Sequence, residues 1–327
     1  MKTADTAARP ILTLRRYVEE LESSITLCLA DPQPRAAHHL RTSTRRIEAQ
    51  LTLLSLLPNL TLPEKVVNRV RKHLRELRRA AGRVRDLDVQ LGLLDDPASL
   101  IGGTASTQLQ RHSHKLRSFF AEERQQEASE LQSLLQQLQR KLTRSLERLF
   151  EVLKPFEPLT ILASDLIAAV QSWFEHESLA VLQGKESNAE RLHDIRKSAK
   201  LARYMLESAP ASARKARKLA RAFEEVQQSG GRWHDWLTLF AQAGQRLGKK
   251  SPLTGALMRH RDTSLAGYRA HLKTIRQLHP RRRTRARGPN SRKLVSVCLF
   301  TCSRSAAFPT SRPSPSSSGS SPRASRT

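Results

Sequence analysis

Apolar residues recur every three or four positions along most of the chain, which is the spacing that lines one face of an α-helix. No segment shows the strict alternation of apolar and polar residues that is typical of a β-strand. Breaks rich in proline or other helix-ending residues, such as DPQPR at 31–35 and KPFEPLT at 154–160, separate several of the helical stretches. The pattern therefore predicts an all-α fold built as a helical bundle. The predicted helices cover residues 11–30, 35–57, 62–94, 105–128, 129–154, 160–182, 188–208, 212–246 and 252–278.

The character of the sequence changes near its end. Residues 281–327 are rich in arginine, serine and proline and contain no acid, a composition that predicts a disordered tail. The tail is either a solvated appendage without a selected function or a nonspecific electrostatic arm. It supplies 11 of the positive charges, so the helical part of the chain keeps a formal net charge of +16.

The whole chain has 327 residues, a formal net charge of +27 and a pI near 11.2. This balance predicts a polyanionic partner: nucleic acid, an anionic membrane surface or a chain of phosphates. Aromatic residues make up only 5% of the chain, which leaves few rings on which unpaired bases could stack. No segment has the pattern of a signal peptide or a transmembrane helix, so we expect a cytoplasmic protein that does not insert into membranes. Three cysteines without regular spacing argue against a disulfide scaffold or a zinc site.

Two stretches of the helical region occur twice. HHLRTSTRRIEA at 38–49 aligns without gaps with HDIRKSAKLARY at 193–204. Further on, AGRVRDLDVQLGLL at 81–94 aligns with GGRWHDWLTLFAQA at 230–243. The offset is about half the length of the helical region, which predicts two stacked helical halves related by pseudo-symmetry.

Cations line one face of at least three of the predicted helices, each within an arc of about 80° at 100° per residue. These stripes are His38, Arg41 and Arg45; His193, Arg196, Lys200 and Arg203; and Arg71, Arg75, Arg78, Gly82 and Arg85. A single stripe is typical of a solvated helix face, but recurrence at matching positions in both copies favours a shared groove. Like charges one turn apart disfavour a helix. Their repulsion is acceptable where the side chains face a hydrated groove that holds an anion. The stripes therefore predict an anion-binding groove.

The four motifs are similar to those of the CHAD domain, a histidine-containing α-helical family. The family pattern H-x-L-R-x-x-x-R-R resembles residues 38–46, and L-R-x-L-x-x-x-x-G-x-x-R-D-x-D resembles residues 74–88. The pattern H-x-x-R-x-x-x-K-x-x-R-Y resembles residues 193–204, and Q-x-x-x-G-x-x-H-D resembles residues 227–235. The resemblance covers about residues 8–278.

The resemblance implies two four-helix-bundle-like halves, about 8–154 and 160–278, around a basic central cavity. The implied ligand is inorganic polyphosphate, so we expect a non-catalytic binding protein. A scaffold that docks to polyphosphate granules is a cellular variant of this hypothesis. Glu48 departs from the family pattern, which often has another basic residue there, and Arg46 could compensate. The stripes and the resemblance together predict these polyphosphate-binding residues: His38, Arg41, Arg45, Arg46, Arg71, Arg75, Arg78, Arg85, His193, Arg196, Lys197, Lys200, Arg203, Tyr204 and His234.

The residue types themselves also suit a phosphate polymer. The planar guanidinium group gives phosphate two parallel hydrogen bonds, and lysine adds a mobile point charge. Nucleic acid is the second candidate ligand, although no helix-turn-helix, homeodomain or zinc-finger motif occurs in the sequence. His38 and His193 are either hydrogen-bonded structural side chains or pH-dependent anion ligands.

The sequence predicts no catalytic residue, no metal site and no cofactor. Asp86, Asp88 and Asp235 lie among arginines, which favours orienting ion pairs over a metal-dependent hydrolase. No P-loop and no serine nucleophile elbow occur. An enzyme that acts on phosphate chains through a histidine intermediate is the third candidate. Gly82 and Gly231 are expected where helices pack closely or kink.

Overall fold

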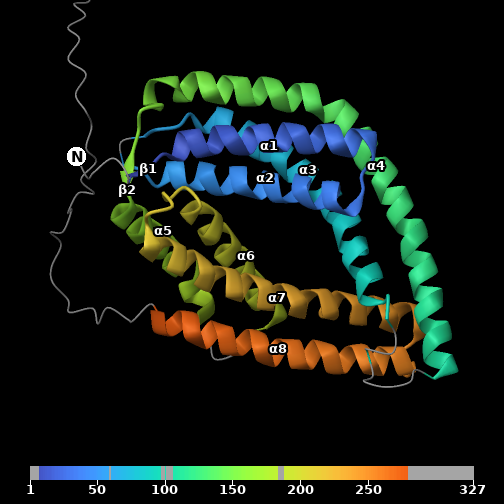
Figure 1. The fold of residues 1–327 in the computed structure, drawn as a ribbon. Helices are drawn as coiled ribbons and strands as arrows, with labels where there is room; N and C mark the ends of the chain where they lie inside the picture. The colour runs from blue at the N-terminus through green and yellow to red at the C-terminus, as the bar shows by residue number, and fades with distance from the viewer. Residues whose placement is uncertain (1–6, 59, 97–99, 101–105, 183–187, 279–327) are drawn as a thin grey trace, which may run out of the picture. The chain divides into compact units, whose positions relative to one another are not determined.

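The computed structural model describes residues 7–58, 60–96, 100, 106–182 and 188–278. Eight α-helices account for nearly all of this part of the chain, so the all-α prediction is confirmed (Figure 1). The helices are α1 (Pro10–Ala30), α2 (Pro34–Ser55), α3 (Glu64–Leu93), α4 (Thr107–Leu153), α5 (Ala163–Leu182), α6 (Ala189–Leu206), α7 (Arg214–Leu247) and α8 (Pro252–Leu278). A 3-10 turn, Lys154–Phe156, follows α4. The predicted disordered tail lies outside the described residues.

Local sequence explains where several helices begin and end. Pro10 and Pro34 are the first residues of α1 and α2, where a backbone N–H would have no partner within the helix. Ser106 and Asn188 cap α4 and α6, because their side-chain oxygens accept hydrogen bonds of 3.3 and 2.9 Å from backbone N–H groups of the first turn. Gly248, with a φ of 84°, ends α7 in a conformation that other residues rarely adopt.

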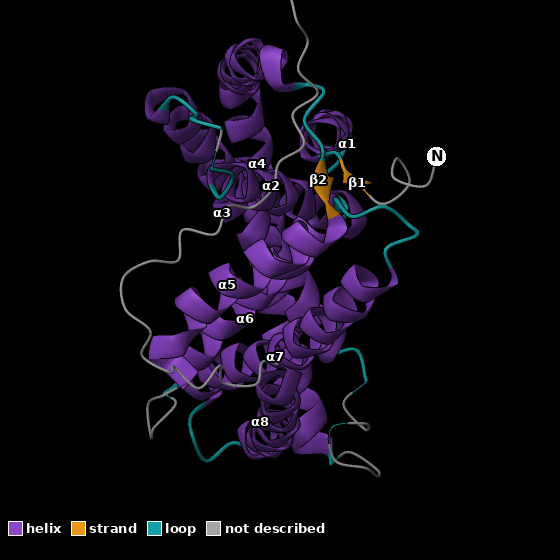
Figure 2. Ribbon diagram, turned by 90° about the vertical axis from the view of Figure 1, so that its left-hand side faces the viewer, coloured by secondary structure: helices purple, strands orange, loops and turns teal. Residues whose placement is uncertain are grey.

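Two sequence-based expectations are wrong. The predicted helices 105–128 and 129–154 are one continuous helix, α4, of 47 residues, because no glycine or proline interrupts the stretch. The chain also contains two short strands, β1 (Ala7–Ala8) and β2 (Ile161–Leu162), which pair antiparallel (Figure 2). Two residues on each strand are too few to produce a detectable alternation in the sequence.

Helices α1 to α4 share one apolar core. Leu14, Leu40, Ile47 and Leu74 are fully buried in it, and Leu146 covers it from the C-terminal part of α4. In sequence order, α1 packs against α2, α2 against α3 and α3 against α4. Figure 1 shows the long α4 beginning beside α8, which it contacts, and then curving over this group toward its C-terminal end.

Helices α5 to α8 surround a second core that is richer in aromatic side chains. Phe174 of α5 and Phe223 of α7 pack with their ring centroids 4.7 Å apart. Trp233 stacks on Tyr268 of α8 at 5.8 Å, and the Tyr268 hydroxyl donates to the backbone oxygen of Leu192 at 2.8 Å. None of the helices in the described ranges combines the length and the apolar character needed to cross a membrane.

The two groups of helices meet at two apolar contacts. At the first contact, α2 packs on α6 and inserts Ala49 and Leu53 into the second core. At the second contact, Leu87 and Phe120 of α3 and α4 join Leu239 and other residues of α7 and α8. The polar faces of α2, α3, α6 and α7 lie between these contacts, which leaves room there for a polar site.

Candidate anion-binding site

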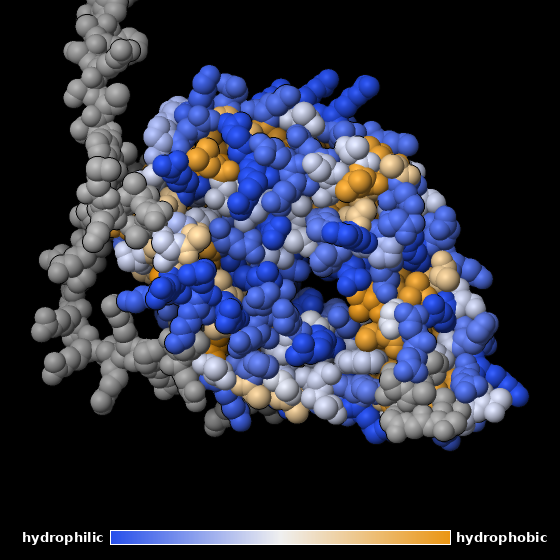
Figure 3. Space-filling view, in the orientation of Figure 1, coloured by the Kyte–Doolittle hydropathy of each residue, from blue (hydrophilic) through white to orange (hydrophobic). Residues whose placement is uncertain are grey.

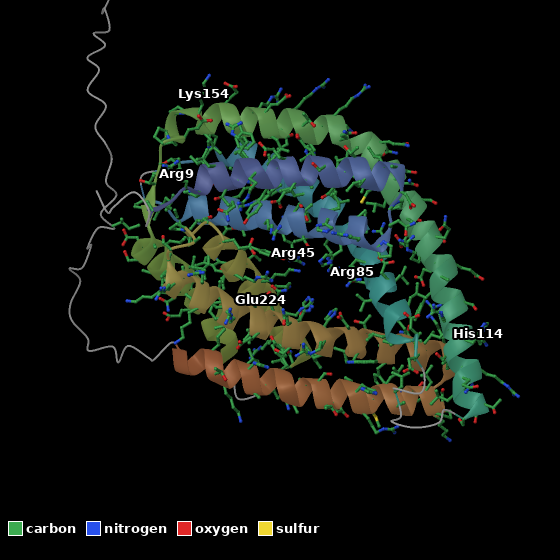
Figure 4. The ribbon with its side chains drawn as sticks, viewed as in Figure 1. Arg9, Arg45, Arg85, His114, Lys154 and Glu224 are labelled. Atoms are coloured by element: carbon green, nitrogen blue, oxygen red, sulfur yellow. The ribbon has the colours of Figure 1, made fainter. Side chains whose placement is uncertain are left out.

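A polar pocket of about 350 Å³ lies between α2, α3, α6 and α7. Figure 3 shows a hollow in this region with hydrophilic surface on its left and below it. Figure 4 shows Arg45 reaching from α2 and Arg85 from α3 into the space above α7. The predicted residues that line the pocket are His38, Arg41, Arg45, Arg85, Arg196, Lys197, Lys200 and His234. The structure thus brings residues from both copies of the repeat to one cavity.

Arg41 and Arg196, at aligned positions of α2 and α6, have similar surroundings. Arg41 donates to the Asp86 carboxylate at 2.7 Å and lies over Gly82, whose missing Cβ would be 3.7 Å from the Arg41 Cζ. In the second half, a Cβ on Gly231 would lie 3.8 Å from an Arg196 nitrogen. Each glycine therefore sits against an arginine of the neighbouring helix.

The orienting role predicted for the aspartates is confirmed where the structure gives an ion pair. Asp86 pairs with Arg41, and Asp88 pairs with Arg124 at 3.0 Å in a nearly buried position. Asp235 lies 3.9 Å from His234, and its charge partly offsets the burial that lowers the pKa of Arg196. In the described residues, no group of three or more His, Cys, Asp or Glu side chains is arranged to hold a metal ion.

Arg45 and Lys200 are buried cationic side chains in surroundings dominated by other cations, although the charge of Glu48 partly offsets this effect on Arg45. Within the described part of the chain neither forms a salt bridge, and the Arg45 Nε is buried without a hydrogen-bond partner. Burial and the neighbouring cations Arg41 and Arg78 lower the pKa of Arg45 to about 10. Burial and the Arg45 guanidinium lower the pKa of Lys200 well below its usual value. An anion between these side chains would offset both effects.

Two of the predicted site histidines, His38 and His193, have lowered pKa values that favour the neutral ring. Partial burial, followed by the charges of Arg85 and Lys200, lowers the pKa of His38 to about 4. Burial and Arg196 likewise lower the pKa of His193 to about 4. The His193 ring packs against His234 with centroids 4.6 Å apart, and its Nδ1 is buried without a hydrogen-bond partner. His193 therefore lies behind His234 rather than on the pocket surface.

Three other predicted site residues lie behind the pocket around Glu207, at the end of α6. Arg46 donates to Glu207 at 3.1 Å and to Glu20 at 3.0 Å, so it does not take the place of a basic residue at position 48 in the pocket. Arg203 lies 3.7 Å from the other Glu207 oxygen. Tyr204 is only 3% exposed and is surrounded by these cations. These side chains stabilise the contact between the two groups of helices.

The remaining predicted residues follow α3 away from the pocket. Arg78 forms an ion pair with Glu48, the residue that departs from the family pattern. Arg75 and Arg71 lie about one and two turns further toward the start of α3, and neither lines the pocket.

The pocket also has lining residues that the sequence stripes did not single out. Arg232 lines it from α7, together with Gln227 and Gln228. Arg232 occupies the position aligned with Arg83, but Arg83 turns away and pairs with Glu127 on α4. The sequence repeat could have indicated Arg232, because this residue directly follows Gly231, the glycine that aligns with Gly82.

Solved structures resemble this fold, among them one from Ricinus communis and one from Streptomyces chartreusis. The crystal structure of the CHAD domain from the plant Ricinus communis matches with a TM-score of 0.56 and 20% identity, covering 84% of this chain and 93% of that one. PptA from Streptomyces chartreusis matches with a TM-score of 0.55 and 18% identity, covering 81% of this chain and 95% of that one. Identities this low show a common fold. No curated protein shows significant sequence similarity to the chain.

Sequence comparison identifies the family. Residues 13–242, well over half of the chain, match the CHAD domain family. This match agrees with the four motifs and with the likeness to the Ricinus communis CHAD domain, and it confirms the resemblance expected from the sequence. The chain is a member of the CHAD domain family.

Proposed function

We propose that this protein binds inorganic polyphosphate in the pocket between α2, α3, α6 and α7 and does not break it down. The observation that carries the proposal is the pair Arg45 and Lys200, whose charges have no salt-bridge partner among the described residues. The CHAD family is known for polyphosphate binding and is generally non-catalytic. Both facts support a binding role for the pocket.

The chemistry of the pocket suits a chain of phosphates. Arginines from α2, α3, α6 and α7 converge on one cavity, so several neighbouring phosphates can each meet a guanidinium group. Asp86 orients Arg41, and so limits the conformational entropy that this side chain loses on binding. Arg71 and Arg75 extend the basic face of α3 beyond the pocket, whereas Arg78 is paired with Glu48.

Nucleic acid fits the pocket less well. Tyr204 and Trp233 are 3% and 2% exposed, so neither ring can receive a stacked base. The high net charge still predicts nonspecific attraction to nucleic acid, and this attraction should weaken steeply with salt.

We further propose that the binding unit spans residues 8–278 as two pseudo-symmetric halves, about 8–154 and 160–278, around the basic cavity. In this proposal the protein acts in the cytoplasm and at polyphosphate granules. The parallel surroundings of Arg41 and Arg196 support the pseudo-symmetry.

A titration of the full-length protein with fluorescently labelled polyphosphate tests the proposal. In the pocket variant, Arg41, Arg45, Arg196 and Lys200 are changed to glutamine. In the control variant, the exposed α4 residues Arg140, Lys141, Arg144 and Arg148 are changed to glutamine, which removes the same charge.

We expect the pocket variant to lose at least about 100-fold in affinity at about 150 mM salt while the control stays within a fewfold of wild type. Circular dichroism should report the same helicity for all three proteins, and the ligand should keep its chain length after incubation. Equal losses of affinity in both variants would show that binding depends only on the net charge of the protein. Shortening of the chain would make the protein an enzyme.

A further inference from the structure

The first two turns of α7 carry an unusual exposed stripe of cations outside the pocket. Residues 214–221, RKARKLAR, contain five cations and no acid. Ala216, Leu219 and Phe223 turn the opposite face of this segment toward the core. All five cations are exposed, and none forms a salt bridge with a described residue.

The stripe works against the stability of α7. Four of its cations, Arg214, Arg217, Lys218 and Arg221, are spaced three or four residues apart, and each such like-charge pair disfavours the helix by about 0.2–0.5 kcal/mol. The positive end of the helix dipole also disfavours cations in the first turn. Arg221 has acids one turn away, Glu224 and Glu225, as Arg144 and Arg148 of α4 have Glu147 and Glu151. The other four cations of the segment have no acid three or four residues away along the helix.

Helical geometry connects this stripe to the pocket. With 100° per residue, Arg214, Arg217, Lys218 and Arg221 fall within an arc of about 100°. Gln228 and Arg232, which line the pocket, fall within the same arc of the same helix. Gln228 lies about 10 Å along the helix axis from Arg221. The exposed stripe therefore leads to the mouth of the pocket along one face of α7.

Two glutamates lie between the stripe and the pocket. Glu224 is held by Arg203 at 3.3 Å, so its charge is partly neutralised. Glu225 is exposed and lies on the same face as the stripe. It is the only acid within that arc between Arg221 and Arg232.

We propose that Arg214, Arg217, Lys218 and Arg221 form a second binding surface for the same polyphosphate chain, reached when the chain is longer than the pocket. The inference rests on the proposed function of the pocket. A short phosphate chain fills the pocket alone. A long chain leaves it past Gln228 and Arg232 and follows α7 outward, so the protein prefers long chains over short ones.

The test compares two ligands, tripolyphosphate and long-chain polyphosphate, on the full-length protein. The stripe variant changes Arg214, Arg217, Lys218 and Arg221 to glutamine, a strong helix former. The matched control is the α4 variant described above, which loses the same number of charges from another exposed helix. Dissociation constants are measured at several salt concentrations.

We expect the stripe variant to lose at least about tenfold in affinity for long chains, with the salt dependence falling by about 0.7 in log–log slope per lost contact. Its affinity for tripolyphosphate should stay within about twofold of wild type, and the α4 control should leave both ligands nearly unaffected. The variant Glu225→Gln should strengthen binding of long chains only, because it removes the acid from their path.

Three results would overturn the inference: equal losses for long chains in the stripe and α4 variants, equal losses for both ligands in the stripe variant, or unchanged long-chain binding. The proposed function fails separately, if wild-type protein binds neither ligand or if the pocket variant still binds tripolyphosphate fully.

Discussion

Arg45 allows a quantitative prediction, because its charge is buried beside other cations. Its pKa falls from 12.5 to about 10, chiefly through burial and then through Arg41 and Arg78. One pKa unit corresponds to about 1.4 kcal/mol, so keeping this side chain charged destabilises the empty fold by roughly 3 kcal/mol at pH 7. Because the pKa is lowered on folding, this destabilisation is fully present at neutral pH and fades only as the pH rises above about 10.

We therefore expect Arg45→Met to stabilise the empty protein. Methionine keeps part of the aliphatic packing and removes the charge, so after allowing for lost contacts the free energy of unfolding should rise by about 1–2 kcal/mol. The melting temperature should rise by about 2–6 °C for a domain of this size. The same change should weaken polyphosphate binding by about 10- to 100-fold, because a charged hydrogen bond contributes about 1.5–3 kcal/mol.

Arg78→Met is the matched control, because Arg78 has the partner that Arg45 lacks. Arg78 and Glu48 pair with only 17% and 24% of their side chains exposed. Removing Arg78 leaves Glu48 without that partner and should lower the free energy of unfolding by about 1–3 kcal/mol. Urea denaturation with and without tripolyphosphate measures both effects. If Arg45→Met also destabilises the empty protein, then Arg45 is a structural residue and the reasoning is wrong.

Further predictions concern packing and pH. A Cβ at Gly230 would lie 2.8 Å from the buried Tyr268 ring, so Gly230→Ala should lower the free energy of unfolding by about 1–3 kcal/mol. Gly231→Ala should leave the free energy of unfolding nearly unchanged, because its Cβ would meet only an Arg196 nitrogen at 3.8 Å. Equal melting temperatures for the two variants would contradict this prediction. His38 and His193 have pKa values of about 4 in the folded empty protein, so its stability should fall as the pH drops from about 6.5 toward 4, where the unfolded chain binds more protons. Polyphosphate should raise both pKa values, so calorimetric titrations near pH 6 in buffers of different ionisation enthalpy should reveal proton uptake; identical heats in all buffers would argue against it.

The helices were largely predictable because their signals are local. Proline at the start of α1 and α2 and the apolar period along each helix act within a few residues. The prediction of two helices over residues 105–154 was wrong because no helix-breaking residue lies between them, and the stretch forms the single helix α4. The pairing of β1 with β2 joins residues far apart in the sequence, and no local pattern reports such a contact.

The pocket was predictable only in part, because helical spacing gives the face of a residue but not its partners. Arg45 and Arg46 are neighbours in the sequence, yet one remains without a carboxylate and the other binds Glu20 and Glu207. Glu20 belongs to α1 and Glu207 follows the last residue of α6, so only the tertiary fold separates the two arginines.

The aligned glycines of the repeat also predicted the close helix contacts only in part. The alignment of Gly231 with Gly82 predicted close packing at Gly231. The neighbouring Gly230 has the closer contact, with Tyr268 of α8. The sequence alignment cannot reveal this requirement, because it depends on how α7 packs against a helix outside the repeated motifs.

A crystal structure of the full-length protein with tripolyphosphate is the most direct test of the central claim. We predict phosphate groups in the pocket between α2 and α6, within hydrogen-bond distance of the Arg45 guanidinium and the Lys200 ammonium. An empty pocket in crystals that hold the ligand elsewhere on the basic surface would contradict the assignment.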